Sequence, residues 1–305
     1  MRHLFIINPV AGGKKGRFQE KEREIRSFAE TQRDPCEIYV TKGPMDACRK
    51  VMAEAESDDM LYVYACGGDG TLNECANGAA GRSDIAITHY PCGTGNDFIK
   101  MFGKADEQRF RSLQALAEGT VRPVDLVDCD GRFGINIASV GADARIGADV
   151  HKYSGFPLIG GSTGYIVSLV VNLIKGITHP FRIVIGDQTL EGVFTLVCAC
   201  NGRFYGGGFN PVPDAMPDDG LLDFLIAKGL TRLQFIRLVG KFAKGRFREL
   251  GDVFTYVRGD YMEVESDAEF VVGFDGEALV AKKTYFKVVP GGVNFIFPSG
   301  MEFFG

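Results

Sequence analysis

At the centre of the first half of the chain stands Cys66-Gly67-Gly68-Asp69-Gly70-Thr71-Leu72-Asn73-Glu74, directly after the apolar run Leu61-Tyr62-Val63-Tyr64-Ala65. The apolar run predicts a buried strand, and the glycines at its end allow backbone N–H groups to close on a phosphate. The carboxylate of Asp69 lies among these glycines, where it is available for a metal ion. Because glycine weakens a strand interior, three glycines around a charge favour a functional loop over strand filler. The simpler alternative is a surface turn before a helix.

Strands and helices alternate across the first third of the chain. The predicted strands are residues 4–7, 37–40, 61–65 and 85–90, and the predicted helices are 16–30, 46–55 and 71–79. This alternation predicts βαβ units and a parallel sheet with helices on both faces. Such sheets bind ligands at the carboxyl ends of their strands.

Glycine-containing loops follow all four of these strands. The other three loops are Asn8-Pro9-Val10-Ala11-Gly12-Gly13-Lys14-Lys15-Gly16, Thr41-Lys42-Gly43 and Pro91-Cys92-Gly93-Thr94-Gly95-Asn96-Asp97-Phe98. Each loop alone is more typical of a turn, but a doubly wound sheet brings all four to one edge. The GxxxxGK[ST] phosphate loop is absent, and no GxGxxG fingerprint follows the first strand, so the expected nucleotide site is of another kind. Lys14 and Lys15 either neutralise phosphate charge or are simply solvated.

A β-rich region begins near residue 124. A helix at 108–118 precedes strands at 124–128, 133–139, 181–185, 193–200, 221–227, 252–258, 261–264, 269–274 and 284–289. Turn sequences such as Asp130-Gly131 and Gly186-Asp187 separate them, which predicts a sandwich or barrel. We therefore expect an α/β nucleotide-binding domain at 1–123 and a β-sandwich domain at 124–290. Residues 291–305 contain a last strand that can return to the first domain.

Composition limits the classes of protein. With 45% hydrophobic and 24% charged residues, the 305-residue chain is typical of a soluble globular protein with two domains. A net charge of −5 argues against nucleic acid as a partner. The eight cysteines form no CxxC pair and lie mostly in apolar runs, which predicts buried thiols in a reducing compartment. The apolar run at the start is too short for a signal peptide, so we expect a cytoplasmic protein.

One uncharged segment, residues 154–174, is long enough to cross a bilayer. Its first half contains Pro157 and several glycines, and only residues 165–174 are continuously apolar and helix-like. We therefore expect a loop followed by a helix buried against a sheet.

Two acidic stretches lie in the second region. Gly273-Phe274-Asp275-Gly276-Glu277 either aims two carboxylates into a cleft or forms the corner of a hairpin. Asp214-Ala215-Met216-Pro217-Asp218-Asp219-Gly220-Leu221-Leu222-Asp223 either holds a hard cation or forms a solvated acidic loop.

Residues 230–250 predict a basic amphipathic helix. Four cations lie at helical spacing on one side and four apolar residues on the other: Arg237, Lys241, Lys244 and Arg248 opposite Phe235, Leu238, Val239 and Phe242. This pattern fits docking on an anionic lipid surface. It fits equally a helix packed on the sheet with a solvated cationic face.

The motifs of both regions occur together in one known order. They are Gly67-Gly68-Asp69-Gly70-Thr71-Leu72-Asn73-Glu74 with Asn77-Gly78, then Pro91-x-Gly93-Thr94-Gly95-Asn96-Asp97-Phe98, Asp219-Gly220-x-Leu222-Asp223 and Asp275-Gly276-Glu277. In this order, covering essentially the whole chain, they closely resemble the soluble bacterial diacylglycerol kinase family of lipid kinases. NAD kinases and phosphofructokinases share the Gly-Gly-Asp-Gly core, but the residues that follow it are similar to those of lipid kinases. The resemblance implies an NAD kinase/phosphofructokinase-like α/β domain, a β-sandwich domain and an active site in the cleft between them.

The resemblance also implies chemistry and residues. It implies transfer of the γ-phosphate of ATP, with Mg²⁺, to the hydroxyl of diacylglycerol or a similar lipid alcohol. The product is phosphatidic acid or the corresponding lipid phosphate, as in phospholipid biosynthesis. The implied ATP site is lined by Asn8, Gly12, Gly13, Thr41, Gly67, Gly68, Asp69, Gly70, Thr71 and Thr94.

Three carboxylates are the expected catalytic groups. The resemblance implies that Asp275 or Glu277 takes the proton of the lipid hydroxyl, and it leaves open which one does. From phosphoryl-transfer chemistry we expect Asp69 to place a catalytic Mg²⁺ or its waters. The resemblance further implies a structural Mg²⁺ at the carboxylate of Asp219 and the carbonyls of Met216 and Leu221.

A lipid substrate implies transient contact with a membrane surface. The acceptor stays open at this level: a sphingoid base, a ceramide or a soluble alcohol would use the same nucleotide site. A non-catalytic nucleotide-binding regulator is disfavoured because Asp69, Asp275 and Glu277 are all present. The oligomeric state is open as well, a homodimer included.

Overall fold

The structure is a computed structural model that describes residues 1–12, 15–55, 58–142, 144–145 and 176–303. Its contacts divide the chain into two compact units. Unit 1 comprises Met1–Asp125 and Pro290–Gly305, and unit 2 comprises Leu126–Val289. Strands β5 (Thr120–Cys129) and β13 (Glu277–Phe297) run from one unit into the other. The sequence placed these boundaries after residues 123 and 290.

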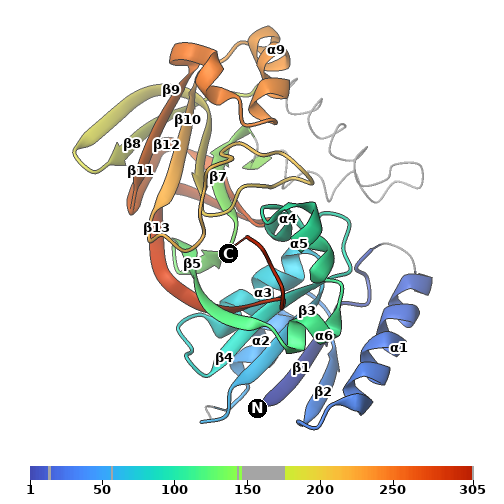
Figure 1. The fold of residues 1–305 in the computed structure, drawn as a ribbon. Helices are drawn as coiled ribbons and strands as arrows, with labels where there is room; N and C mark the ends of the chain where they lie inside the picture. Colours follow the sequence, from blue (N-terminus) through green and yellow to red (C-terminus); the bar gives the residue numbers. More distant parts are fainter. Residues whose placement is uncertain (13–14, 56–57, 143, 146–175, 304–305) are drawn as a thin grey trace. The chain divides into compact units, whose positions relative to one another are not determined.

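Unit 1 is built on a parallel sheet with the strand order β13-β4-β3-β1-β2 (Figure 1). Its first four strands are β1 (Arg2–Ile7), β2 (Cys36–Val40), β3 (Leu61–Gly67) and β4 (Ile85–Pro91). The end of β13 joins this sheet through the pairs Asn294–Ala86 and Phe295–Ile87. All residues of β4 are buried, as expected of a parallel strand covered on both faces.

Six helices connect the strands in the part of unit 1 that the structure describes. They are α1 (Lys15–Thr31), α2 (Asp46–Met52), α3 (Asp69–Ala79), α4 (Asp97–Lys100), α5 (Gly103–Arg109) and α6 (Leu113–Ala117). The predicted α/β class is confirmed, but the single helix predicted at 108–118 is wrong. The chain breaks there because the side chain of Ser112 caps α6, accepting the N–H of Ala115 at 3.2 Å.

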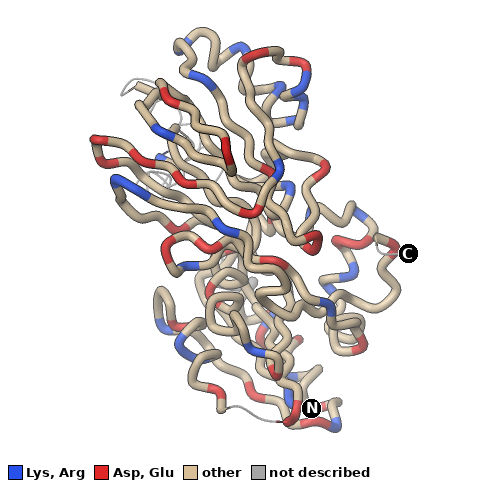
Figure 2. The backbone as a smooth tube through the Cα atoms, turned by 90° about the vertical axis from the view of Figure 1, so that its left-hand side faces the viewer, with Lys and Arg blue, Asp and Glu red and all other residues tan. Residues whose placement is uncertain are grey.

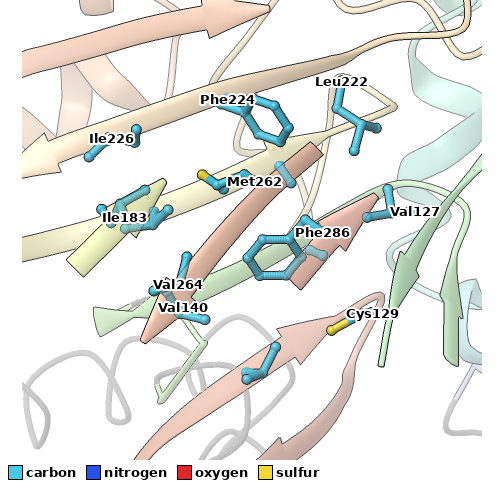
Figure 3. Close-up of a cluster of buried hydrophobic side chains, with 14 of the residues drawn as sticks. Val127, Cys129, Val140, Ile183, Leu222, Phe224, Ile226, Met262, Val264 and Phe286 are labelled. Carbon is cyan, nitrogen blue, oxygen red and sulfur yellow. The ribbon is translucent and has the colours of Figure 1, made fainter. Parts of the chain in front are cut away.

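Unit 2 is an antiparallel β structure, which confirms the predicted β-rich sandwich-like domain. Its described strands, besides parts of β5 and β13, are β6 (Arg132–Gly134), β7 (Ile137–Gly141), β8 (His179–Ile185), β9 (Gln188–Cys200), β10 (Leu222–Lys228), β11 (Phe254–Gly259) and β12 (Tyr261–Phe274). They pair in the order β11-β10-β9-β7-β12-β13, and β8 bridges β9 and β12. Alternate residues enclose an apolar core in which Phe224, Met262 and Phe286 are fully buried (Figure 3).

Two strand predictions in unit 2 were wrong. The strand expected at 133–139 is divided into β6 and β7, because the N–H groups of Ile135 and Asn136 bond to a side chain in place of a neighbouring strand. The strands expected at 261–264 and 269–274 form the single strand β12. A register shift between Glu265 and Phe270 produced the apparent gap.

The helix expected at 230–250 is shorter than predicted. Helix α9 (Arg232–Phe242) begins at a capping box between Thr231 and Gln234 and is followed by a 3₁₀ segment, η1 (Phe247–Val253). Gly245 stops the helix with a φ of +68°, where an added Cβ would lie 2.1 Å from Pro213.

No helix in the described part of the chain is long and apolar enough to cross a membrane. The uncharged segment 154–174 lies outside the described residues. The eight cysteines all lie in the described residues and none is in a disulfide; six of them are buried, while Cys36 and Cys92 are partly exposed.

The aromatic cluster beneath β13 gives a test of the returning strand. Phe295 is fully buried, and its ring centroid lies 5.3 Å from that of Phe98 and 4.9 Å from that of Phe297. Phe295→Ala leaves a cavity there and should lower the free energy of unfolding by about 3–5 kcal/mol in urea denaturation. Val10→Ala, at a side chain 79% exposed, is the control and should change it by less than about 0.5 kcal/mol. A change below about 1 kcal/mol for Phe295→Ala would contradict the packing of β13 in unit 1.

Candidate active site

The loops after β1 and β3 are joined at the carboxyl edge of the unit 1 sheet. Asn8 Nδ2 donates to Thr71 Oγ1 at 3.1 Å, and the backbone N–H of Asn8 donates to the carbonyl of Cys66 at 3.0 Å. The N–H of Thr71 donates to the carbonyl of Gly68 at 3.0 Å, so helix α3 begins directly behind the glycines. A Cβ on Gly67 would lie 2.2 Å from Thr71 Oγ1. This contact explains why glycine is required at residue 67.

The loop after β4 packs backbone against backbone on the loop after β3. The N–H groups of Cys92 and Gly93 donate to the carbonyl of Gly67 at 2.8 and 3.0 Å. A Cβ on Gly93 would lie 2.6 Å from Gly68 Cα, and one on Gly12 would lie 2.7 Å from the carbonyl oxygen of Cys92. Glycines thus let three loops meet closely, which is the arrangement that a phosphate-binding edge needs.

The carboxylate of Asp69 holds the loop after β4 in place. Its Oδ2 accepts the N–H of Asn96 at 2.7 Å, and its Oδ1 accepts the N–H of Asp97 at 2.5 Å. A Cβ on Gly95 would lie 2.5 Å from Asp69 Oδ2, so the loop can approach only as glycine. Burial raises the pKa of Asp69, and the two N–H donors and the charge of Lys100 oppose that shift. The structure therefore gives Asp69 a loop-holding role; its contact with Mg²⁺ stays a prediction.

The described residues of the predicted ATP site lie together at one edge of unit 1. They lie at or just after the ends of β1 (Asn8, Gly12), β2 (Thr41), β3 (Gly67, Gly68, Asp69, Gly70, Thr71) and β4 (Thr94). The N–H of Thr41 donates to the carbonyl of Ile7 at 2.9 Å, which ties the second loop to the first strand. Gly13, Lys14 and the side chain of Lys15 lie outside the described residues.

A cavity of about 260 Å³ lies beside these loops in unit 1. Its walls include Asn8 and Gly93, and also Phe18, Lys21 and Arg111. Sequence reasoning missed the last three, because α1 and the α5–α6 connection bring them to the loops from outside any motif. Lys21 Nζ is held by Tyr90 Oη and Glu24 Oε2, both at 2.8 Å. Glu20 lines the cavity as well, so its wall carries both signs of charge. An aromatic ring and Arg111 beside phosphate-binding loops fit an anionic aromatic ligand such as a nucleotide.

His89 supports the carbonyl on which the two glycine loops meet, and the sequence pattern did not identify it. It is fully buried in β4, with Nε2 3.2 Å from the carbonyl oxygen of Gly67. That carbonyl is the one that accepts the N–H groups of Cys92 and Gly93. Burial lowers the pKa of His89 to about 4. The imidazole is therefore neutral at physiological pH and donates to Gly67 through Nε2.

In unit 2, the carboxylate of Asp275 accepts three consecutive backbone N–H groups. Oδ2 accepts those of Ile135 at 2.6 Å and Asn136 at 3.1 Å, and Oδ1 accepts that of Ile137 at 3.1 Å. Asp275 occupies the turn between β12 and β13 with a φ of +45°, followed by Gly276 at +92°. This capture is the reason for the break between β6 and β7.

Glu277 differs sharply from Asp275. It is the first residue of β13 and is partly exposed, and its register partner is Phe274. Among the described residues it has neither a hydrogen-bond nor an ion-pair partner for its side chain. The predicted catalytic pair therefore consists of one carboxylate saturated by the backbone and one whose oxygens can accept a proton.

The carboxylate of Asp219, which was expected to hold a structural Mg²⁺, is engaged in other contacts. Asp219 Oδ1 accepts the N–H of Leu221 at 3.1 Å, and Oδ2 pairs with the guanidinium of Arg258. Within the described ranges, no three or more His, Cys, Asp or Glu side chains are grouped to hold a metal ion. As arranged, the Asp219 carboxylate is not free for Mg²⁺, because the ion would have to displace Arg258. The Mg²⁺ site at Asp219 with the carbonyls of Met216 and Leu221 stays a prediction.

The buried imidazole gives a pH prediction. The pKa of His89 is lowered from its ordinary 6.5 to about 4, so below pH 6.5 the unfolded chain binds a proton that the folded chain does not. The free energy of unfolding should therefore fall between pH 6.5 and 4, by on the order of 3 kcal/mol from this residue. His89→Gln, which keeps a donor and does not titrate, should show a shallower decrease in urea denaturation over this range. Parallel pH curves for the two proteins would contradict the burial of a neutral His89.

The contact between the two glycine loops gives a second prediction. Gly93→Ala places a Cβ against backbone that cannot move aside, so the loops must separate. We expect the dissociation constant for ATP to rise by at least about tenfold, measured by calorimetry. Gly43→Ala is the matched control in the neighbouring loop, because an added Cβ there meets nothing within 4 Å. Equal ATP affinity in the two variants would exclude this contact from the nucleotide site.

Comparison with known proteins agrees with both units. Residues 2–129 match the diacylglycerol kinase catalytic domain, and residues 136–297 match the YegS C-terminal NAD kinase beta sandwich-like domain. A probable lipid kinase YegS-like of Pseudomonas aeruginosa is 30% identical over 286 residues, 92% of each chain. Another, of Stenotrophomonas maltophilia, is 30% identical over 278 residues, 88% of this chain and 89% of that protein.

A solved structure gives the same result. The crystal structure of a putative diacylglycerol kinase from Bacillus anthracis str. Sterne superimposes with a TM-score of 0.75 at 25% identity, over 98% of this chain and 97% of that one. The family expected from the motifs is thus confirmed: the chain belongs to the diacylglycerol kinase family of YegS-like lipid kinases.

Proposed function

We propose that this kinase transfers the γ-phosphate of ATP to the hydroxyl of diacylglycerol or a similar lipid alcohol, giving phosphatidic acid or the corresponding lipid phosphate. Membership of the lipid kinase family supports the reaction class. The observation that carries the proposal is the contrast between Asp275, held by three N–H groups, and Glu277, whose side chain has no partner among the described residues. Phosphorylation of an alcohol needs a base with a free lone pair, and Glu277 supplies one.

The roles of the chain follow from this contrast. The loops after β1, β3 and β4 would bind the ATP phosphates through backbone N–H groups, with Arg111 adding positive charge beside them. Glu277 would accept the proton of the acceptor hydroxyl as that oxygen attacks the γ-phosphorus and the bond to ADP breaks. Asp275 would act as a positioning residue that fixes the turn carrying Glu277. Mg²⁺ bound with ATP would neutralise negative charge on the β- and γ-phosphates.

The two carboxylates should respond differently to isosteric amide substitution. Glu277→Gln removes the base but no contact, so kcat should fall at least about a hundredfold with an unchanged melting temperature. Asp275→Asn leaves at least one buried N–H without an acceptor, which should lower the free energy of unfolding by about 1–3 kcal/mol and reduce kcat as well. Kinase assays and thermal denaturation of both variants separate the roles. If Glu277→Gln keeps near-normal kcat, Glu277 is not the base.

The acceptor is identified by a screen. The protein is incubated with ATP and, separately, diacylglycerol, a sphingoid base, a ceramide and glycerol, and products are detected by mass spectrometry. Phosphatidic acid should be the main product, and Glu277→Gln should abolish it, which excludes a contaminating kinase. If the main product is a sphingoid, ceramide or glycerol phosphate, the corresponding alcohol is the acceptor in place of diacylglycerol. If none of the alcohols is phosphorylated, the proposal is overturned.

A further inference from the structure

Helix α9 presents two large apolar side chains to solvent. Leu233 and Ile236 are 57% and 58% exposed and lie one helical turn apart. At 100° per residue they lie, with Gly240, on the side opposite Phe235 and Leu238. Phe235 and Leu238 pack on the small buried cluster of Ala142, Ile177 and Leu230.

The apolar stripe expected from the sequence is therefore the inner side of the helix. Phe242 is buried, with its ring 5.8 Å from that of Phe254, and Phe235, Leu238 and Val239 are partly buried. Packing within unit 2 accounts for Phe235, Leu238 and Phe242. It leaves Leu233 and Ile236 unexplained.

Leu233 and Ile236 lie in a strongly cationic segment that follows β10. Residues 229–248 contain six basic residues and no Asp or Glu, although the whole chain carries a net charge of −5. Figure 2 marks Lys and Arg in blue and Asp and Glu in red along the whole described backbone. The six are Arg232, Arg237, Lys241, Lys244, Arg246 and Arg248.

Ion pairing leaves part of this charge unbalanced. Lys241 and Arg246 share Glu249, and Arg248 pairs with Asp214 at 2.9 Å. Arg237 and Lys244 have no ion-pair partner among the described residues. Arg237 lies next to Leu233 on the outer side of α9, so apolar and cationic groups occupy the same surface.

We propose that α9 and the turn after it (residues 231–246) dock on a membrane surface of anionic phospholipid. Leu233 and Ile236 would enter the boundary between head groups and acyl chains, while Arg237 and Lys244 would lie against lipid phosphates. Solvation explains isolated cations, but it gives no reason for two exposed aliphatic side chains between them. The proposal rests on the proposed function in one respect: a lipid acceptor lies in such a surface.

Vesicle co-sedimentation of the full chain tests the docking without turnover. The probes are phosphatidylcholine vesicles with and without phosphatidylglycerol, at low and high salt. The wild type should sediment only with the phosphatidylglycerol vesicles, and less at high salt. Leu233→Gln with Ile236→Gln, and separately Arg237→Gln with Lys244→Gln, should each lower the partition coefficient by about tenfold or more.

A matched control comes from the same unit. Val280 is 64% exposed in β13, so Val280→Gln makes the same change of an aliphatic to an amide away from α9 and should leave vesicle binding unchanged. Thermal denaturation checks folding, which exposed substitutions should preserve. Unchanged binding by the α9 variants, or a wild type that ignores anionic vesicles, overturns the docking surface.

Turnover separates this proposal from the proposed function. With diacylglycerol dispersed in a neutral detergent, the α9 variants should keep wild-type kcat while their activity on anionic vesicles falls. A wild type that binds vesicles as expected but phosphorylates no alcohol would sink the proposed function and leave the docking surface intact. If the α9 variants lose activity equally in detergent and on vesicles, the helix is needed for folding or for the reaction itself, and the docking proposal is overturned.

Discussion

The capture of three consecutive N–H groups by the Asp275 carboxylate is the interaction on which the unit 2 site depends. A buried N–H without an acceptor is unfavourable by about 1–3 kcal/mol, so a chain that leaves strand pairing at Ile135 and Asn136 needs a substitute acceptor. Asp275 supplies it, at a separation of about 140 residues in sequence. The bond in return fixes a turn whose first residue has a positive φ, and that turn carries Glu277.

Unit 1 uses the same device. Asp69 accepts the N–H groups of Asn96 and Asp97, and the glycines at 67, 93 and 95 allow the loops to come close enough for these bonds. Two acidic residues that motif reasoning assigns to chemistry are therefore also acceptors for the backbone. Loss of activity on replacing either one cannot by itself identify a base or a metal ligand, because the loops would move as well. Stability has to be measured beside turnover.

The sequence predicted the features that depend on short spacing. Alternating apolar runs and glycine loops gave the parallel sheet of unit 1, the β structure of unit 2 and the edge at which Asn8, Thr71 and Thr94 gather. The sequence did not predict features that depend on residues far away along the chain. The break at Ile135 depends on Asp275, and the cavity beside the loops depends on Lys21 and Arg111, which belong to no motif. From the sequence, His89 is indistinguishable from the other residues of a buried strand. Its supporting role depends on a hydrogen bond to Gly67 of the neighbouring strand, which the sequence does not reveal.

Helix α9 shows why amphipathic patterns alone cannot assign a membrane surface. Phe235, Leu238, Val239 and Phe242 have the helical spacing of an apolar face, and so do Leu233 and Ile236. Only the contacts of the folded unit tell which group is already covered by protein. Once the first group is assigned to packing, the residual exposed apolar surface is small and is surrounded by cations. A surface of that kind binds weakly through apolar contact alone and gains most of its affinity from anionic charge. Attachment would then be reversible and sensitive to salt, which suits an enzyme that must leave one patch of lipid to reach the next.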